Sequence, residues 1–216
     1  MNNSVALFFI HTTIATFLLG IKFVIRKDSA FKYFGIGLIL NAVAFAFWTV
    51  VVFLQPENIK PLVTAGVIFF LFSLFAYFVS SIQKMDKSIR NYIMWSGLIG
   101  IIILFILRIF VYPSNPGFSS EGLFFFNPHP IIQALEIFGL AMIALPAVSN
   151  LASKFSNPGH SALMHYGFIV QVMGAIILIA STNNTLLYVA GWVIGIGYLI
   201  LWTVLLFSKK AWEGIK

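Results

Sequence analysis

The chain has 216 residues, of which 60% are hydrophobic and only 9% are charged, and its mean hydropathy is +0.99. A soluble domain is about half apolar and about one quarter charged, so this composition excludes an ordinary soluble protein. The chain has no cysteine, which excludes disulfides, thiolate metal sites and cysteine nucleophiles. The composition therefore predicts an all-α integral membrane protein.

Seven apolar runs follow one another, and a helix of about 20 residues crosses a bilayer core of roughly 30 Å. The sequence predicts a single domain over residues 1–216, a bundle of seven transmembrane helices. Residues 55–58 (Gln-Pro-Glu-Asn) break the chain after the second run, and Pro61 suits a first helical turn. Only Thr182 and Asn183 separate the last two runs, which predicts antiparallel neighbours. The predicted spans are residues 4–25, 33–54, 61–82, 90–112, 130–150, 160–181 and 184–207.

The positive charges lie on one side of the predicted bundle. Of the 13 Lys and Arg residues, the opposite side carries only Lys60, and Arg108 lies within a span. The positive-inside rule then places the N-terminus outside and the C-terminus in the cytoplasm of a cell membrane. The net charge of +7 is thereby explained by topology and by anionic lipids, not by nucleic acid. The residues on the basic side are Lys22, Arg26, Lys27, Lys32, Lys84, Lys87, Arg90, Lys154, Lys209, Lys210 and Lys216.

Arg108 and Glu136 are ionisable residues inside predicted spans, where a charge costs roughly 2.5–3.5 kcal/mol. With about 1.5 Å of rise per residue, Arg108, Glu136 and His11 all lie about 6–10 Å below the outer boundary. On the fifth helix, His129, Gln133 and Glu136 follow i, i+4, i+7 spacing and share one stripe. Ile143, Ala147 and Asn150 continue this stripe, and we expect it to face the interior of the bundle.

These five residues, Arg108, Glu136, Gln133, His11 and His129, are the predicted ligand-binding set. As the floor of an outward-facing pocket, Arg108 would bind an anionic group and Glu136 a cation or a proton. Two structural interpretations remain beside this one. Arg108 and Glu136 could form a salt bridge that fixes helix packing, or Arg108 could extend its head to the membrane surface.

The fourth loop, residues 113–129, is the longest connection. Its Asn115-Pro116-Gly117 sequence fits a type II turn, with Pro second and Gly third. The apolar residues 123–126 (Leu-Phe-Phe-Phe) either lie among lipid headgroups or fold over the bundle as a lid. The sequence favours the lipid anchor, whereas a lid would bring His129 and Glu121 to the pocket.

Motifs of known chemistry are missing. The sequence has no H-E-x-x-H, G-x-S-x-G, P-loop or dinucleotide fingerprint, so it predicts no catalytic residue, no metal and no cofactor. Gly191 and Gly195 form a G-x-x-x-G motif which, with Gly197 nearby, predicts a helix-packing surface. Asn41 and Gln171 are expected to form hydrogen bonds between helices.

The sequence thus favours a receptor-like or accessory module that is not an enzyme. Such a module would have an outward-facing polar pocket or a partner-binding surface, with membrane lipids and other membrane subunits as its partners. The first alternative is a small secondary transporter, or a proton or ion pathway, that uses Glu136. An intramembrane enzyme that modifies lipids is the least favoured, because it needs a nucleophile or a metal that the motifs do not supply.

Overall fold

The computed structural model describes the backbone of residues 3–25, 27–83, 85–120, 122–152 and 160–207, and the side chains of these residues between 9 and 145 and between 166 and 203. Internal contacts divide the chain into two compact units, Met1–Glu136 and Ile137–Lys216. The single seven-helix domain stays a prediction. Some residues used in the predictions lie outside the described part, namely Arg26, Lys84, Glu121, Lys154, Lys209, Lys210 and Lys216.

The described part of the chain is helical apart from two short strands, and every predicted helix is present. The helices are α1 (Asn3–Val24), α2 (Ser29–Leu54), α3 (Lys60–Ser81), α4 (Lys87–Ile106), α5 (Pro130–Ala152), α6 (His160–Ala180) and α7 (Asn184–Phe207). A π-helical turn, η1 (Leu107–Val111), continues α4, and strands β1 (Gly117–Phe118) and β2 (Phe124–Phe125) lie in the fourth loop.

Capping residues explain where several helices begin and end. The Asp28 carboxylate accepts a 2.7 Å hydrogen bond from the N–H of Ala30, so α2 begins at Ser29 and not at residue 33. Gln55 ends α2 in the left-handed conformation, and Pro61 lies in the first turn of α3 as predicted. Asn183 accepts a 2.9 Å hydrogen bond from the N–H of Leu186 and caps α7.

Four helices are long and apolar enough to cross a membrane. They are Ser29–Leu54, Lys60–Ser81, Lys87–Val111 and Asn184–Thr203. The described apolar parts of the other three helices are shorter, at Phe9–Val24, Pro130–Leu145 and Tyr166–Ala180. These lengths and compositions are compatible with a membrane location, while seven spans and their orientation stay predictions.

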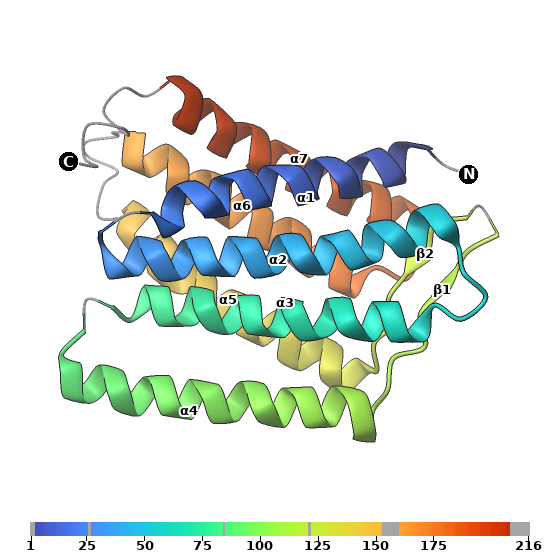
Figure 1. The fold of residues 1–216 in the computed structure, drawn as a ribbon, viewed down its shortest axis with the longest axis horizontal. Coiled ribbons are helices and arrows are strands. Elements are labelled where there is room, and N and C mark those ends of the chain that lie inside the picture. The colour runs from blue at the N-terminus through green and yellow to red at the C-terminus, as the bar shows by residue number, and fades with distance from the viewer. Residues whose placement is uncertain (1–2, 26, 84, 121, 153–159, 208–216) are drawn as a thin grey trace. The chain divides into compact units, whose positions relative to one another are not determined.

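In the first unit, α1 to α4 form a row in which each helix runs opposite to the one before it (Figure 1). Glycines allow α1 and α2 to pack closely. A Cβ atom on Gly35 would lie 2.6 Å from the backbone N of Val24 and 2.8 Å from the carbonyl O of Gly20. Backbone atoms cannot move aside as a flexible side chain can, so this crossing requires glycine.

Gly35→Ala should therefore lower the free energy of unfolding by about 1–3 kcal/mol, because the added methyl group pushes two helix backbones apart. Gly100→Ala in α4 is the matched control, since a Cβ atom there meets nothing within 4 Å. The control should be neutral or stabilising by up to about 1 kcal/mol. Thermal unfolding of both variants in one detergent measures the difference, and equal midpoints would contradict the close-packing argument.

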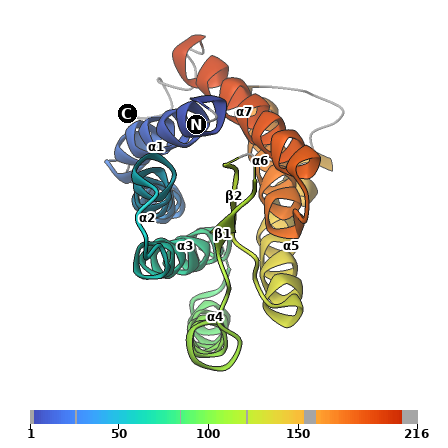
Figure 2. The same cartoon turned by 90° about the vertical axis from the view of Figure 1, so that its right-hand side faces the viewer.

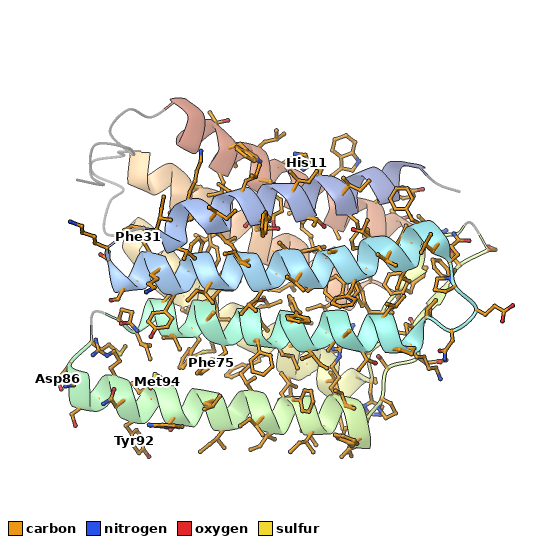
Figure 3. All side chains as sticks on the ribbon, in the orientation of Figure 1. His11, Phe31, Phe75, Asp86, Tyr92 and Met94 are labelled. Carbon is orange, nitrogen blue, oxygen red and sulfur yellow. The ribbon has the colours of Figure 1, made fainter. Side chains whose placement is uncertain are left out.

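Helix α4 is the least buried helix of the first unit. No residue of Lys87–Ile106 is buried, and in the following turn Arg108 is the buried residue. Figure 3 shows Tyr92 pointing away from α3, whereas Met94 and Phe75 lie between α3 and α4. Seen along the helices in Figure 2, α4 lies at the end of the row beyond α3. Its attachment at the Arg108 end is therefore important for the unit.

In the second unit, α6 and α7 pack as antiparallel neighbours, as predicted. A Cβ atom on Gly167 would meet Leu201 and Gly197, and one on Gly174 would meet Ile194 and Ala190. Gly197 of the predicted packing surface does pack closely, because a Cβ atom there would lie 2.9 Å from the carbonyl O of Gly167 and 2.9 Å from the backbone N of Gln171. The prediction is wrong for Gly191 and Gly195 among the described residues, because a Cβ atom on either glycine meets nothing within 4 Å.

Candidate functional site

Arg108 and Glu136 form a buried ion pair within the first unit. The Arg108 Nη1 donates a hydrogen bond to the Glu136 Oε1, and the two side chains are only 5% and 2% exposed. Arg108 therefore does not extend to the surface, which contradicts the snorkelling interpretation. Its Nε is buried without a hydrogen-bond partner, so the Glu136 carboxylate alone compensates this charge among the described residues.

The π-helical turn places Arg108 at the end of α4. The N–H of Tyr112 donates to the carbonyl O of Leu107 over 2.7 Å, which is the i to i+5 bond of a π-turn. Such turns insert an extra residue and change the direction of the side chains that follow, and they are frequent at functional sites. The sequence carried no visible signal for this turn.

Beginning next to the ion pair, several contacts join the two ends of the fourth loop one after another. We call this series of contacts the loop ladder. The Tyr112 and His129 rings stack with their centroids 4.4 Å apart. Next, the N–H of Asn115 donates to the carbonyl O of Asn127 over 3.2 Å. The antiparallel strands follow, with Gly117 opposite Phe125 and Phe118 opposite Phe124.

A tight turn closes the loop ladder. The N–H of Gly122 donates to the carbonyl O of Ser119 over 2.9 Å, and the N–H of Ser119 donates to the carbonyl O of Leu123 over 2.8 Å. Gly122 has a φ of 75°, which a side chain would strain. The predicted type II turn at residues 115–117 is wrong, because Gly117 lies in β1 and only Gly122 among the described glycines has a positive φ.

The apolar residues of the loop pack against protein. The Phe126 ring meets the Trp48 ring of α2 edge-on with centroids 4.6 Å apart, and Phe124 meets Phe126 at 4.8 Å. Leu123, Phe124 and Phe126 are all buried. The lipid-anchor interpretation of residues 123–126 is therefore wrong. An aromatic run next to a membrane looks the same in sequence whether it contacts lipid or protein.

An open groove lies between the hairpin and the α2–α3 connection, and we call it the loop groove. Both walls belong to the first unit, and Figure 1 shows the strands beside the end where α2 turns into α3. Its volume is about 490 Å³. It is lined by Gln55, Pro56, Glu57, Asn58, Ile59, Lys60, Pro116, Phe118, Ser119, Ser120 and Gly122.

The structure brings together only part of the predicted ligand-binding set. Arg108 and Glu136 meet, and Gln133 lies half-buried one turn before Glu136. His129 is exposed, and its Nδ1 accepts a 3.3 Å hydrogen bond from the N–H of Ile131 at the start of α5. His11 is exposed on α1 (Figure 3). None of the five residues lines the loop groove.

The predicted interior stripe of α5 is buried in part. Glu136 and Ile143 of the stripe are buried together with Ile132 and Leu140, and Gln133 is half-buried, whereas His129 at the start of the stripe is exposed. Asn150, at its end, has a side chain outside the described part. Asn41 and Gln171 each have a buried side-chain atom without a hydrogen-bond partner. For the Asn41 Oδ1 and the Gln171 Nε2, the predicted hydrogen bonds between helices are therefore not formed.

No group of three or more His, Cys, Asp or Glu side chains within the described ranges could hold a metal ion. Comparisons with models of known protein families, with curated proteins and with solved structures find no match for this chain. The candidate site therefore consists of the loop groove, with the loop ladder and the Arg108–Glu136 ion pair as the contacts that hold the fourth loop.

Proposed function

We propose that this chain is a receptor-like membrane module that binds a small molecule in the loop groove. The observation that carries the proposal is the anchored hairpin. Its strands are held by the loop ladder and by the contact of Phe126 with Trp48, so one wall of the groove has a fixed position. A volume of about 490 Å³ falls within the range of roughly 300–1,000 Å³ typical of small-molecule sites.

In this proposal the ion pair is structural. Arg108 lies four residues before Tyr112, and Glu136 lies seven residues after His129, so the pair joins the two helix ends from which the loop rises. A binding site gains affinity when its walls are ordered before the ligand arrives. The pair and the loop ladder supply this order, and the ligand contacts the loops above them.

The orientation in this proposal is N-terminus outside, with seven spans in a cell membrane. The basic residues carry it, because Lys27, Lys32 and Lys87 lie at the end of the first unit opposite to the loop groove. The groove then opens to the external medium. The exposed apolar side chains of α4 and η1, such as Tyr92 and Phe110, contact lipid or a neighbouring subunit.

Two measurements test the proposal. The chain lacks cysteine, so Asn58→Cys and Ser120→Cys provide single labelling sites in the groove, and Ser88→Cys provides one at the other end of the unit. A maleimide that cannot cross membranes should label the first two in intact cells and Ser88→Cys only after permeabilisation. Labelling of Ser88→Cys alone in intact cells would overturn the orientation.

The second measurement is native mass spectrometry of small molecules bound to the purified protein. Phe126→Ala releases the hairpin from Trp48 and should lower the bound fraction about tenfold or more. Phe138→Ala is the matched control, because that ring is 65% exposed, and it should leave binding unchanged. Equal binding by both variants would overturn the groove as the site. Proton flux in liposomes that Glu136→Gln abolishes would instead favour the transporter alternative.

A further inference from the structure

Two side chains of opposite charge line the loop groove and take no part in the described ion pairs or hydrogen bonds of the fold. Glu57 and Lys60 both line it, three residues apart, and both are exposed. Within the ranges that the structure describes, neither side chain takes part in an ion pair or a hydrogen bond. Folding therefore leaves a carboxylate and an ammonium group available on one wall of the groove.

The wall that carries Lys60 also favours a bound anion. Lys60 is the first residue of α3, and Ile59 before it gives no side-chain hydrogen bond to the helix start. The first N–H groups of a helix carry a partial positive charge and attract carboxylates, and in α3 these belong to Lys60 and Leu62, because Pro61 has no N–H. A carboxylate near Lys60 would meet both the ammonium group and this helix end. Glu57, on the preceding connection, offers the complementary contact for a cation.

The rest of the lining suits a small polar molecule. Gln55 and Asn58 add amide groups, and Ser120 adds a hydroxyl group at the hairpin turn. Pro56, Ile59, Pro116 and Phe118 add apolar surface between these groups. Because the groove is open on one side, part of the ligand can extend into solvent. The lining therefore has the groups to bind a small molecule that carries one positive and one negative group.

We propose that the loop groove binds a small zwitterion of the amino-acid class. Lys60 and the start of α3 bind its carboxylate, and Glu57 binds its ammonium group. The ligand's side chain points out of the groove, so it contributes little to selectivity. This inference rests on the proposed function, because it names the class of ligand for the same groove.

Isothermal titration calorimetry on the full chain in lipid nanodiscs tests this pairing with three probes. L-alanine carries both charges, N-acetyl-L-alanine lacks the ammonium group, and L-alaninamide lacks the carboxylate. L-alanine should bind, and each blocked analogue should bind about tenfold more weakly, because one charged hydrogen bond is lost. Equal affinity for all three probes would overturn the zwitterion.

Variants assign each charge to its partner. Glu57→Gln should weaken L-alanine about tenfold but leave N-acetyl-L-alanine unchanged, and Lys60→Gln should weaken L-alanine but leave L-alaninamide unchanged. Lys32→Gln is the matched control, an exposed lysine outside the groove, and it should bind like the native protein. If the two groove variants also bind like the native protein, the assignment is wrong.

The two proposals fail in different ways. Binding of a neutral sugar, lost in Phe126→Ala but unchanged in Glu57→Gln, would overturn the zwitterion and preserve the receptor-like function. Labelling of Ser88→Cys alone in intact cells, together with no small molecule retained by the native protein, would overturn both. Binding of L-alanine that Glu57→Gln and Lys60→Gln both weaken would support both.

Discussion

Replacing either member of the buried ion pair alone, as Arg108→Met or as Glu136→Gln, is expected to lower the free energy of unfolding by about 3–5 kcal/mol. Each single variant leaves the other group buried without its opposite charge. The double variant should recover most of the loss, because neither charge then remains. Thermal or denaturant unfolding in a mild detergent measures all three variants, and the recovery is the coupling energy of the double-mutant cycle.

Lys87→Met is the control for removing one positive charge, since Lys87 is exposed at the start of α4. It should change the free energy of unfolding by no more than about 0.5 kcal/mol. A double variant as unstable as the sum of the two single variants would show that the pair is not coupled. A double variant that folds normally but no longer binds a ligand would make the pair part of the binding site.

Proteolysis of the single variants should show where stability is lost. Helix α4 has no buried residue before Arg108, and its other described attachments include the contact of Gly97 with Phe78 and a 3.0 Å hydrogen bond from Arg90 to the carbonyl O of Gln83. Arg90 lies in the first turn of α4 and Gly97 near its middle, so neither of these two contacts holds the end of α4 next to the fourth loop. Loss of the ion pair should therefore expose the fourth loop to protease before the rest of the unit.

The helices were predictable because their signals are local. A run of apolar residues ended by polar or proline residues fixes a helix to within a few residues, as it does for α3 and α7. The predicted start of α2 is wrong because Asp28 caps the helix and extends it into a basic segment. Hydropathy alone does not assign this segment to a helix. The π-turn at Leu107–Val111 is set by tertiary contacts and has no sequence pattern.

The ion pair was also predictable, because a charge at membrane depth needs a partner and Glu136 offered one at the depth of Arg108. The predicted depth did not show that His11 is exposed. Depth gives the position of a residue along a helix but not the face of the helix on which the residue lies. The loop groove was missed because its walls come from two loops that are far apart in sequence. Glu57 and Lys60 were visible only as polar residues of a turn.

Trp48→Ala is expected to destabilise the first unit by about 3–5 kcal/mol and to release the hairpin. The indole ring is buried and contacts Phe45, Phe70 and Phe126, and it lies so close to Gly66 that a Cβ atom there would collide with it. Removing the ring leaves a cavity between α2, α3 and the hairpin. Unfolding midpoints measure the first effect, and protease cleavage within residues 113–129 measures the second.

Two further variants test separately how much the indole N–H group and the position of the ring contribute to stability. Trp48→Phe keeps an aromatic ring and removes a buried Nε1–H that has no hydrogen-bond partner, so it should cost less than about 1.5 kcal/mol. Gly66→Ala keeps the ring but displaces it, because the added Cβ atom would collide with it, at a cost of about 1–3 kcal/mol. Trp192→Ala is the control for losing an indole, because that side chain is 75% exposed.

If packing around Trp48 holds the hairpin, the variants should differ in a fixed order in ligand binding and in protease cleavage of the fourth loop. Trp48→Ala and Gly66→Ala should both weaken ligand binding and expose the fourth loop, since each disturbs the ring on which Phe126 rests. Trp48→Phe should preserve both properties. If Trp48→Phe were as damaging as Trp48→Ala, the Nε1–H would have a partner in the functional protein, and a ligand or a bound water beside Trp48 would have to replace packing as the explanation.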